Sequence, residues 1–456
     1  MKVNRSEMIL KGSVSKAVLV LALPIMANNL IQTFYNLTDT FFVSKLGTTQ
    51  LAAMQFTFSL IFFMMSIGMG LSIGGLALIS QYIGGKKNDD AKKTAGQLMT
   101  ASVIASIIVG GLGALLSSSI ITWMGATGEL HYYSTTYLRI MFLGAPTMFV
   151  TFAFNGIKQG EGDTLTPMIL STLSVILNII LDPIFIFVLD LGIAGAAYAT
   201  ILSRAIFNVV SLYILFSKKH NTLGLHKRDF KINLLYLSPI LKIGMPAALG
   251  QSMTSLGFTV LNVFILSYGE TILTAFAIGN RISSIIFMPA MGISGALTTI
   301  IGQNIGADNY KRANEAFLKS VGIASSIMLT GAASMFFFTD QLVGLFSDDP
   351  YIIREGGYYL KMILITIPLF GFFNCLTGLF QGSGHTWSAM ILNIGRLWGL
   401  RVPMILLLKA FNYNDPVWIW YAMIGSNFII CIIGLFMYLS GRWKIPVIKK
   451  RKSVAV

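Results

Sequence analysis

Four residues with oxygen-bearing side chains lie inside long apolar stretches of the first half of the chain: Asp39, Asn178, Asp182 and Thr200. Of the eighteen acidic residues, only Asp39 and Asp182 lie well inside an apolar stretch. A charged side chain near the middle of a bilayer costs roughly 2.5 to 3.5 kcal/mol on insertion scales, so it normally faces an internal cavity and serves transport. We therefore take these four residues as a candidate site that couples to a proton or a sodium ion.

The local sequence around the second acid favours one shared pocket. Asn178 and Asp182 are four residues apart, so they share a helix face. Pro183 cannot donate a hydrogen bond to the carbonyl of Ile179, which frees that oxygen and bends the helix beside the carboxylate. Pro183 is therefore a hinge candidate, and the two acids are expected to bind a cation as a coupled pair. The alternative is that each aspartate caps a broken helix or pairs with a buried arginine such as Arg204.

The elements that position these residues are membrane spans. The chain has 456 residues, of which 55% are hydrophobic and 11% charged, whereas soluble domains carry about a quarter charged residues. Apolar stretches of roughly 20 residues or more, long enough to cross a bilayer, recur along the whole chain. The sequence predicts an all-α polytopic membrane protein with twelve transmembrane helices, near residues 17–45, 51–84, 94–118, 130–158, 166–189, 195–217, 236–268, 271–304, 316–340, 356–380, 388–409 and 417–440.

The net charge of +15 comes from cations that lie mainly in alternate loops between the predicted spans. Lysine and arginine gather in alternate loops, namely in the first 16 residues and in 86–93, 218–231, 311–319 and 442–452. Because cytoplasmic loops carry the excess of these residues, both termini are expected in the cytoplasm and the protein in the cell inner (plasma) membrane. The same distribution removes the reason to expect a nucleic-acid partner.

The chain contains an internal repeat at an offset of 222 residues without a gap. Pro24 corresponds to Pro246, and QGEGDT at 159–164 corresponds to QGSGHT at 381–386. The predicted domains are an N-terminal six-helix lobe (1–217), a cytoplasmic linker (218–235), a C-terminal six-helix lobe (236–440) and a basic tail (441–456). An even number of spans gives both lobes the same orientation. We expect a pseudo-two-fold axis along the membrane normal and a cavity between the lobes for alternating access.

The repeat also serves as an internal control for the acids. The counterparts of the four candidate residues are apolar: Leu261, Leu400, Met404 and Ala422. The register slips by a residue or two near the end, since Pro183 matches Pro403 at an offset of 220. The helical scaffold thus tolerates apolar residues there, which favours a functional role for the acids of the first lobe.

Other chemistries fit less well. QGEGDT does not continue into the GK[ST] of a phosphate-binding loop, so it is interpreted as a tight turn. The four histidines are scattered, which gives no reason to expect a zinc or iron site or another cofactor. A membrane prenyltransferase would need clustered acids that hold a divalent metal, and the pairs Asp89-Asp90 and Asp348-Asp349 lack a further acid at helical spacing.

Several motifs together resemble the multidrug and toxic compound extrusion (MATE) family over nearly the whole chain. They are Pro24 followed by Asp39, QYIG at 81–84, QGEGDT before NIILDP, and GIAGAAYAT at 192–200. The resemblance is to the DinF-like branch, in which the acids lie in the N-terminal lobe. It implies a cation-coupling role for Asp39, Asn178, Asp182 and Thr200, with H+ or Na+ driving drug efflux, and it makes Pro24 a hinge candidate in the first span.

The expected partners are membrane lipid and a small organic substrate, for which a lipophilic cation is the expected class, and the chain is expected to act as a monomer. Three arginines of the second lobe fit a purely cationic substrate less well: Arg281, Arg396 and Arg401. They either lock the helix bundle or contact an anionic group of the substrate. The second case would suit an alternative function, a flippase for an amphipathic or lipid-linked substrate.

Overall fold

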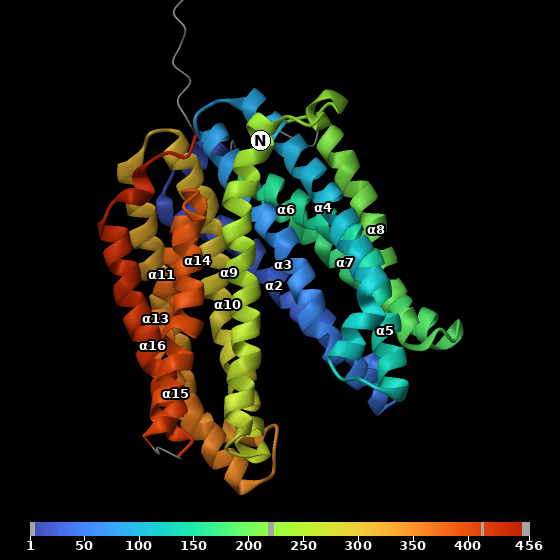
Figure 1. Ribbon diagram of the computed structural model, residues 1–456. Helices are drawn as coiled ribbons and strands as arrows, with labels where there is room; N and C mark the ends of the chain where they lie inside the picture. Colours follow the sequence, from blue (N-terminus) through green and yellow to red (C-terminus); the bar gives the residue numbers. More distant parts are fainter. Residues whose placement is uncertain (1–4, 218–222, 412–414, 449–456) are drawn as a thin grey trace, which may run out of the picture. The chain divides into compact units, whose positions relative to one another are not determined.

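The computed structural model describes residues 5–217, 223–411 and 415–448, and all regular structure in these ranges is helical (Figure 1). The elements are α1 (Arg5–Lys11), α2 (Val14–Ser44), α3 (Thr48–Gly84), α4 (Asn88–Trp123), α5 (Gly128–Leu143), α6 (Ala145–Gly160), α7 (Leu165–Pro183), η1 (Ile184–Val188), α8 (Gly192–Phe216), η2 (Lys227–Phe230), α9 (Leu234–Leu266), α10 (Glu270–Gly306), α11 (Tyr310–Phe336), α12 (Thr339–Gly344), α13 (Pro350–Gly382), α14 (Thr386–Ile394), η3 (Gly395–Arg401), α15 (Val402–Ala410), α16 (Val417–Leu439) and η4 (Arg442–Lys444).

The number of membrane spans agrees with the sequence. Eleven helical segments of the described chain are long and apolar enough to cross a bilayer, and the pair α5 and α6 makes a twelfth span that is bent by 47°. The bend lies at Gly144, directly before α6, and Pro146 is the second residue of that helix. The counterpart Pro368 lies inside the unbroken helix α13. The all-α fold and the twelve spans are therefore confirmed, and proline alone does not decide where a span breaks.

Two spans contain a π-helix that borders a proline. In the first repeat α7 ends at Pro183 and continues as the π-helix η1. In the second repeat the π-helix η3 precedes α15, which has Pro403 in its first turn. A proline lacks the amide hydrogen that would continue the i→i−4 pattern, so the local winding changes. The helix thus changes its winding directly after Pro183, while the predicted bend and the role of Pro183 as a hinge stay predictions.

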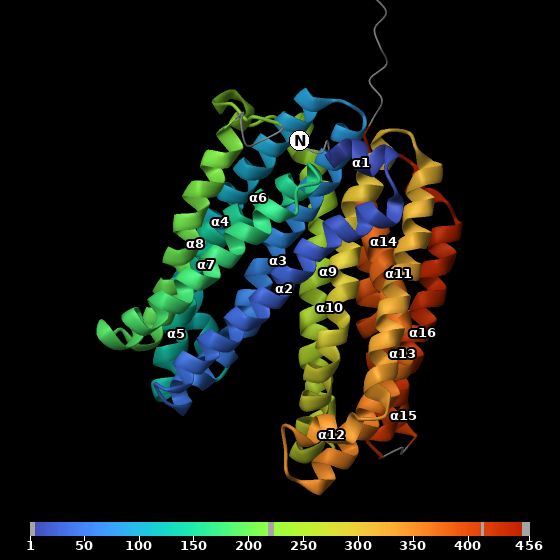
Figure 2. The same ribbon diagram turned by 180° about the vertical axis from the view of Figure 1, so that it is seen from behind.

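The described residues pack into two compact units. Unit 1 contains the described parts of Met1–Ser6 and Ala27–Ser252, and unit 2 those of Glu7–Met26 and Met253–Val456. Within unit 1, α3 packs against α4 and α6, and α7 against α8; within unit 2, α10 packs against α13 (Figure 2). Unit 1 thus contains the first part of α9, the first long helix of the C-terminal lobe. Unit 2 contains the first part of α2, the first long helix of the N-terminal lobe. The packing units cut across the lobes expected at 1–217 and 236–440, which are defined by the repeat.

Equivalent glycines explain this exchange. In unit 1 a Cβ atom on Gly70 of α3 would lie 2.5 Å from the carbonyl oxygen of Gly244, so only glycine lets α9 approach this closely. In unit 2 the counterpart Gly292 of α10 contacts Met26 and Ala22 of α2 in the same way. Small residues of this kind let helix backbones meet in a membrane, where apolar burial from water does not drive association.

Candidate functional site

The two predicted acids are buried in unit 1. Asp39 on α2 is 4% exposed and Asp182 on α7 is fully buried. In the described part of the chain, Asp39 Oδ1 and Asp182 Oδ2 have no hydrogen-bond partner, and neither carboxylate lies within 4 Å of a lysine or arginine nitrogen. The charge of Asp39 acts electrostatically on Asp182, so the two carboxylates belong to one site.

Asn178 joins this site as its spacing predicted. Its Nδ2 donates a hydrogen bond of 3.0 Å to Asp182 Oδ1, which confirms that the two residues share a helix face. Asn178 Oδ1 is itself buried and has no partner among the described residues. The site therefore presents three unsatisfied oxygens, and an unsatisfied buried polar atom costs about 1–3 kcal/mol. A proton or a small cation bound there would offset this cost.

Thr200 on α8 enters the site through a residue that the sequence analysis missed. The hydroxyl groups of Tyr35 and Thr200 lie 2.7 Å apart and hydrogen-bond to each other. Tyr35 precedes Asp39 by one helical turn, so helical spacing is the signal that could have found it. Tyr137 on α5 is also buried and within the electrostatic reach of Asp39. Its counterpart in the repeat is again a tyrosine, Tyr359, so comparison of the lobes gave no signal for it.

Arg204 lies beside the site without pairing directly with an acid. Its guanidinium carbon is 5.8 Å from the centroid of the Tyr35 ring, a cation–π arrangement. Its charge acts on Asp39, yet the described residues contain no ion pair between them within 4 Å. The alternative in which each aspartate forms an ion pair with a buried arginine is therefore not what this structure contains. The single positive charge of Arg204 would also balance only one of the two carboxylate charges.

The arginines of the second lobe lie in unit 2, two of them together. Arg401 donates hydrogen bonds to Ser426 Oγ (3.1 Å) and Asn427 Oδ1 (2.8 Å), and its charge interacts with Arg396. Arg396 is 4.5 Å from the centroid of the Phe373 ring, and its Nε has no partner in the described chain. Both are buried, whereas Arg281 on α10 has an exposed side chain. Packing thus brings Arg396 and Arg401 together and leaves Arg281 at the surface of α10.

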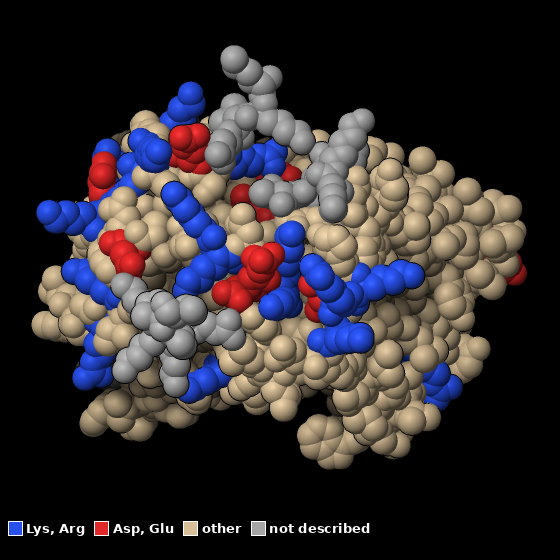
Figure 3. All heavy atoms as spheres, turned by 90° about the horizontal axis from the view of Figure 1, so that it is seen from above, with Lys and Arg blue, Asp and Glu red and all other residues tan. Residues whose placement is uncertain are grey.

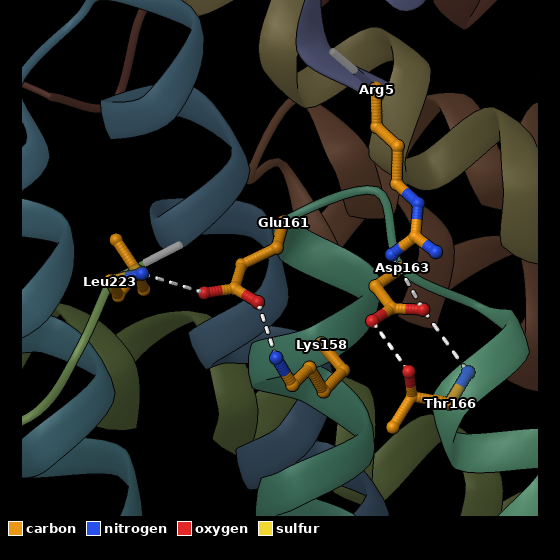
Figure 4. Close-up of polar contacts among 6 residues, drawn as sticks. All are labelled: Arg5, Lys158, Glu161, Asp163, Thr166 and Leu223. Atoms are coloured by element: carbon orange, nitrogen blue, oxygen red, sulfur yellow. Dashed lines mark hydrogen bonds and ion pairs between the residues drawn. The ribbon is translucent and has the colours of Figure 1, made fainter. Parts of the chain in front are cut away.

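The turn between α6 and α7 carries a second polar cluster, which the sequence analysis did not anticipate (Figure 4). The buried Lys158 and Glu161 form an ion pair of 2.9 Å, and Glu161 accepts the amide hydrogen of Leu223 from the linker. Asp163 forms an ion pair of 2.7 Å with Arg5 and accepts two hydrogen bonds from Thr166. This turn therefore ties Arg5 and the linker residue Leu223 to the junction of α6 and α7 within unit 1.

Opposite pKa shifts follow from these contacts. Burial raises the pKa of Glu161 despite the nearby Lys158 ammonium. Burial also opposes ionisation of Asp163, but the hydrogen bonds from Thr166 and the Arg5 guanidinium outweigh it and hold the pKa of this carboxyl below its usual value.

The turn itself has the geometry that the motif predicts. Gly162 has φ +81° and Gly384 has φ +83°, so both copies are tight turns through a left-handed glycine, as expected. The acids Glu161 and Asp163 correspond to Ser383 and His385 in the second copy. The lobe comparison that identified Asp39 and Asp182 would therefore have identified this pair as well.

A duplicated helical bundle with a buried acidic site in one half is typical of secondary transporters. The sequence model of the MatE family matches residues 24–184 and 246–407, that is, once in each repeat. The chain therefore belongs to the MATE family, and the family matches confirm both the resemblance and the internal duplication.

Relatives and solved structures agree with this assignment over nearly the full length. The chain is 30% identical to "Probable multidrug resistance protein YpnP" of Bacillus subtilis, covering 95% of this chain and 97% of that one. It is 28% identical to "Multidrug export protein MepA" of Staphylococcus aureus, covering 94% of each chain. A MOP superfamily transporter from Pyrococcus furiosus, described as having a binding pocket of reverse polarity, superimposes with a TM-score of 0.90 at 29% identity, covering 97% of this chain and 99% of that one. A MATE solved in a "bent conformation" matches with the same TM-score and identity, covering 97% and 98%.

Proposed function

We propose that this MATE protein is a secondary active multidrug efflux transporter that exchanges protons, sodium ions or both for lipophilic organic compounds, chiefly cations, by alternating access. The observation that carries the proposal is the set of three buried oxygens without partners on Asp39, Asn178 and Asp182. The relatives named as multidrug resistance and export proteins support the class of substrate. The protein lies in the plasma membrane as a monomer, with both termini in the cytoplasm.

The exchange follows from linkage. Two desolvated carboxylates within reach of each other are stabilised by a bound cation, so ion binding favours the conformation in which they come together. A substrate that binds more tightly to the opposite conformation lowers the affinity for the ion, even when the two bind at separate sites. The acids occur in one repeat only, which supports placement in the DinF-like branch.

Pro24 is the proposed hinge of this exchange. Packing of α2 changes from unit 2 to unit 1 between Met26 and Ala27, one turn or less after Pro24. The same helix carries Asp39 in its second half. Proline removes one hydrogen bond from the helix, so bending there costs little. Cation binding at Asp39 would thus bias the angle between the two halves of α2.

Transport in liposomes tests the proposal. Wild type, Asp39→Asn and Asp182→Asn are reconstituted, and export of a fluorescent lipophilic cation is measured under separate proton and sodium gradients. We expect gradient-driven export to fall about 5–150-fold in either variant, the range of typical coupling free energies. Asp348→Asn, which removes an exposed carboxylate, is the matched control and should export like wild type. If both site variants export like wild type under both gradients, the carboxylates are structural and the mechanism is wrong.

A flippase for an amphipathic substrate with an anionic group is the second candidate, and Arg396 and Arg401 favour it. Arg401 directly precedes Val402-Pro403, the counterpart of Asp182-Pro183 at the offset of 220, so the two repeats carry opposite charges near equivalent prolines. The same liposomes carrying Arg396→Gln decide between the candidates. Loss of anionic-lipid translocation with unchanged export of the cation favours the flippase, and unchanged lipid translocation removes it.

A further inference from the structure

A basic cleft of about 410 Å³ lies in unit 1, where the first turns of α4 meet the linker helix η2 and the start of α9. Its charged lining consists of four cationic side chains and two carboxylates: Lys92, Lys93, Arg228, Lys231, Asp89 and Asp229. The cleft is separate from the acidic site, and nothing in the transport mechanism uses it. Lysine and arginine gather on this face of the molecule (Figure 3).

The wall of the cleft is fixed by buried contacts between α4 and the linker. Gln97 is 1% exposed, and its Nε2 donates to the carbonyl oxygens of Asp229 (3.0 Å) and Lys231 (2.8 Å). Gln97 Oε1 accepts the amide hydrogen of Asn233 (2.9 Å). A Cβ atom on Gly96 would lie 2.2 Å from the carbonyl oxygen of Asp229, so the linker packs directly on the α4 backbone. The cationic side chains therefore extend from a built scaffold.

The cleft keeps a net positive charge, because four cationic side chains and two carboxylates line it. Asp229 is buried and accepts the amide hydrogen of His226 (2.8 Å), which leaves it less able to neutralise the cleft. Lys92, Arg228 and Lys231 form no ion pair within 4 Å with any acid in the described ranges. Several cations around one concave site suit a phosphate group.

Apolar side chains beside the cleft indicate where that phosphate comes from. Ile232 lines the cleft and is 62% exposed, and Leu234 and Leu235 follow it at the start of α9, 72% and 60% exposed. Exposed apolar residues next to a basic cleft are typical of the boundary between headgroups and acyl chains. A soluble phosphate compound without an apolar part would make no contact with these side chains.

We propose that this cleft binds the phosphate of an anionic phospholipid, with the acyl chains against Ile232, Leu234 and Leu235. The lipid would belong to the cytoplasmic leaflet in the orientation of the proposed function. Because the cleft is built from the linker between the two repeats, a bound lipid would hold the linker on α4. The binding itself does not depend on transport, so the two proposals fail separately.

Lipid binding to the purified full-length protein in neutral detergent tests this. Native mass spectrometry measures the affinity for phosphatidylglycerol and for phosphatidylcholine with the same acyl chains. Wild type should prefer phosphatidylglycerol, and Arg228→Gln/Lys231→Gln should lower that affinity about tenfold, since each cation near the headgroup contributes attraction. The control Lys87→Gln/Lys311→Gln removes two exposed cations outside the cleft and should stay within about twofold of wild type.

Further arms keep the test decisive. Lys92→Gln/Lys93→Gln alters the α4 side of the cleft alone and replaces the first variant if that one loses its folded elution profile. Inorganic phosphate at equal concentration should not displace phosphatidylglycerol. Equal affinity of wild type and both cleft variants, equal affinity for the two lipids, or displacement by inorganic phosphate would each overturn the assignment to an anionic lipid.

Discussion

Tyr35 connects the acidic site to α8 through one hydroxyl group. It hydrogen-bonds to Thr200, and its ring contacts Arg204, whose charge acts on Asp39. A phenolic hydroxyl is a modest contributor to stability, yet it fixes the Thr200 hydroxyl that is a candidate ligand of the cation. At the scale of single residues, the site is thus larger than its carboxylates.

Tyr35→Phe tests this role. The variant keeps the ring and removes the hydroxyl, so we expect a loss of about 1 kcal/mol in stability together with a weaker dependence of export on the coupling ion. Thermal unfolding and the ion-concentration dependence of export in liposomes measure the two effects. Tyr213→Phe, which alters an exposed tyrosine on α8, the helix of Thr200, is the control. An unchanged ion dependence would remove Tyr35 from the site.

Asp163 predicts a pH dependence of stability. Because its pKa is held below the usual 3.8, its stabilisation is present above that pH and is lost as the pH falls through the folded-state value. The ion pair with the half-exposed Arg5 contributes at most about 1 kcal/mol, and the Thr166 hydrogen bonds about 1 kcal/mol more. We expect Asp163→Asn to unfold at lower temperature than wild type at pH 7.

The difference in unfolding temperature between wild type and Asp163→Asn should become smaller below about pH 4. Thermal unfolding of both proteins from pH 7 to pH 3 measures it, and other titrating groups cancel in the difference. Arg5→Gln keeps the Thr166 hydrogen bonds and isolates the ion pair. A gap that does not change with pH would show that the charge of Asp163 contributes nothing.

At the scale of elements, glycine at helix crossings decides which helix packs in which unit. Gly70→Ala places a Cβ atom 2.5 Å from the Gly244 carbonyl oxygen, which belongs to backbone and cannot move aside easily. Overpacking costs about 1–3 kcal/mol, whereas replacing a helical glycine by alanine gains about 0.5–1 kcal/mol. We expect a net loss of stability of about 1 kcal/mol in detergent from these opposing effects.

The control is Gly111→Ala on α4, because a Cβ atom at Gly111 meets no atom within 4 Å. Its thermal unfolding temperature should rise or stay constant. If the two alanine variants behave alike, close approach at Gly70 does not hold α9 in unit 1.

If Pro24 is the hinge of α2, its replacement should change the rate of export. Pro24→Ala restores a hydrogen bond inside α2 and removes the ring that disturbs the preceding turn, so the helix becomes stiffer and the fold no less stable. We expect export to slow severalfold while binding of the fluorescent cation in detergent is unchanged. Pro167→Ala, in the first turn of α7 where proline is tolerated, is the matched control. Export at the wild-type rate would exclude Pro24 as the hinge.

At the scale of the whole molecule, the distribution of lysine and arginine predicts orientation. Lys87 precedes α4 and Glu129 follows it, so the two positions lie at opposite ends of one span. With the buried Cys375 and Cys431 replaced by serine, Glu129→Cys should react with an impermeant maleimide on intact cells. Lys87→Cys should react only after permeabilisation. The reverse pattern would place both termini outside the cell.

The sequence by itself determined the properties that depend on local pattern. Apolar length predicts the twelve spans, fixed spacing reveals the repeat, and the four-residue separation of Asn178 and Asp182 predicts that they share a helix face. Comparison of the lobes identifies acids without counterparts. Each of these depends on residues close in sequence or on the chain compared with itself.

The tertiary structure decided what depends on contacts between distant segments. It brings Tyr35 to Thr200, buries Glu161 and Asp163 in a turn that looks solvated, and packs the first part of α9 with α3. A hydrophobic pattern specifies which face of a helix is apolar but not which neighbour covers it. That choice is made by side-chain volume at the crossings, and for this reason it became visible only once the helices were packed.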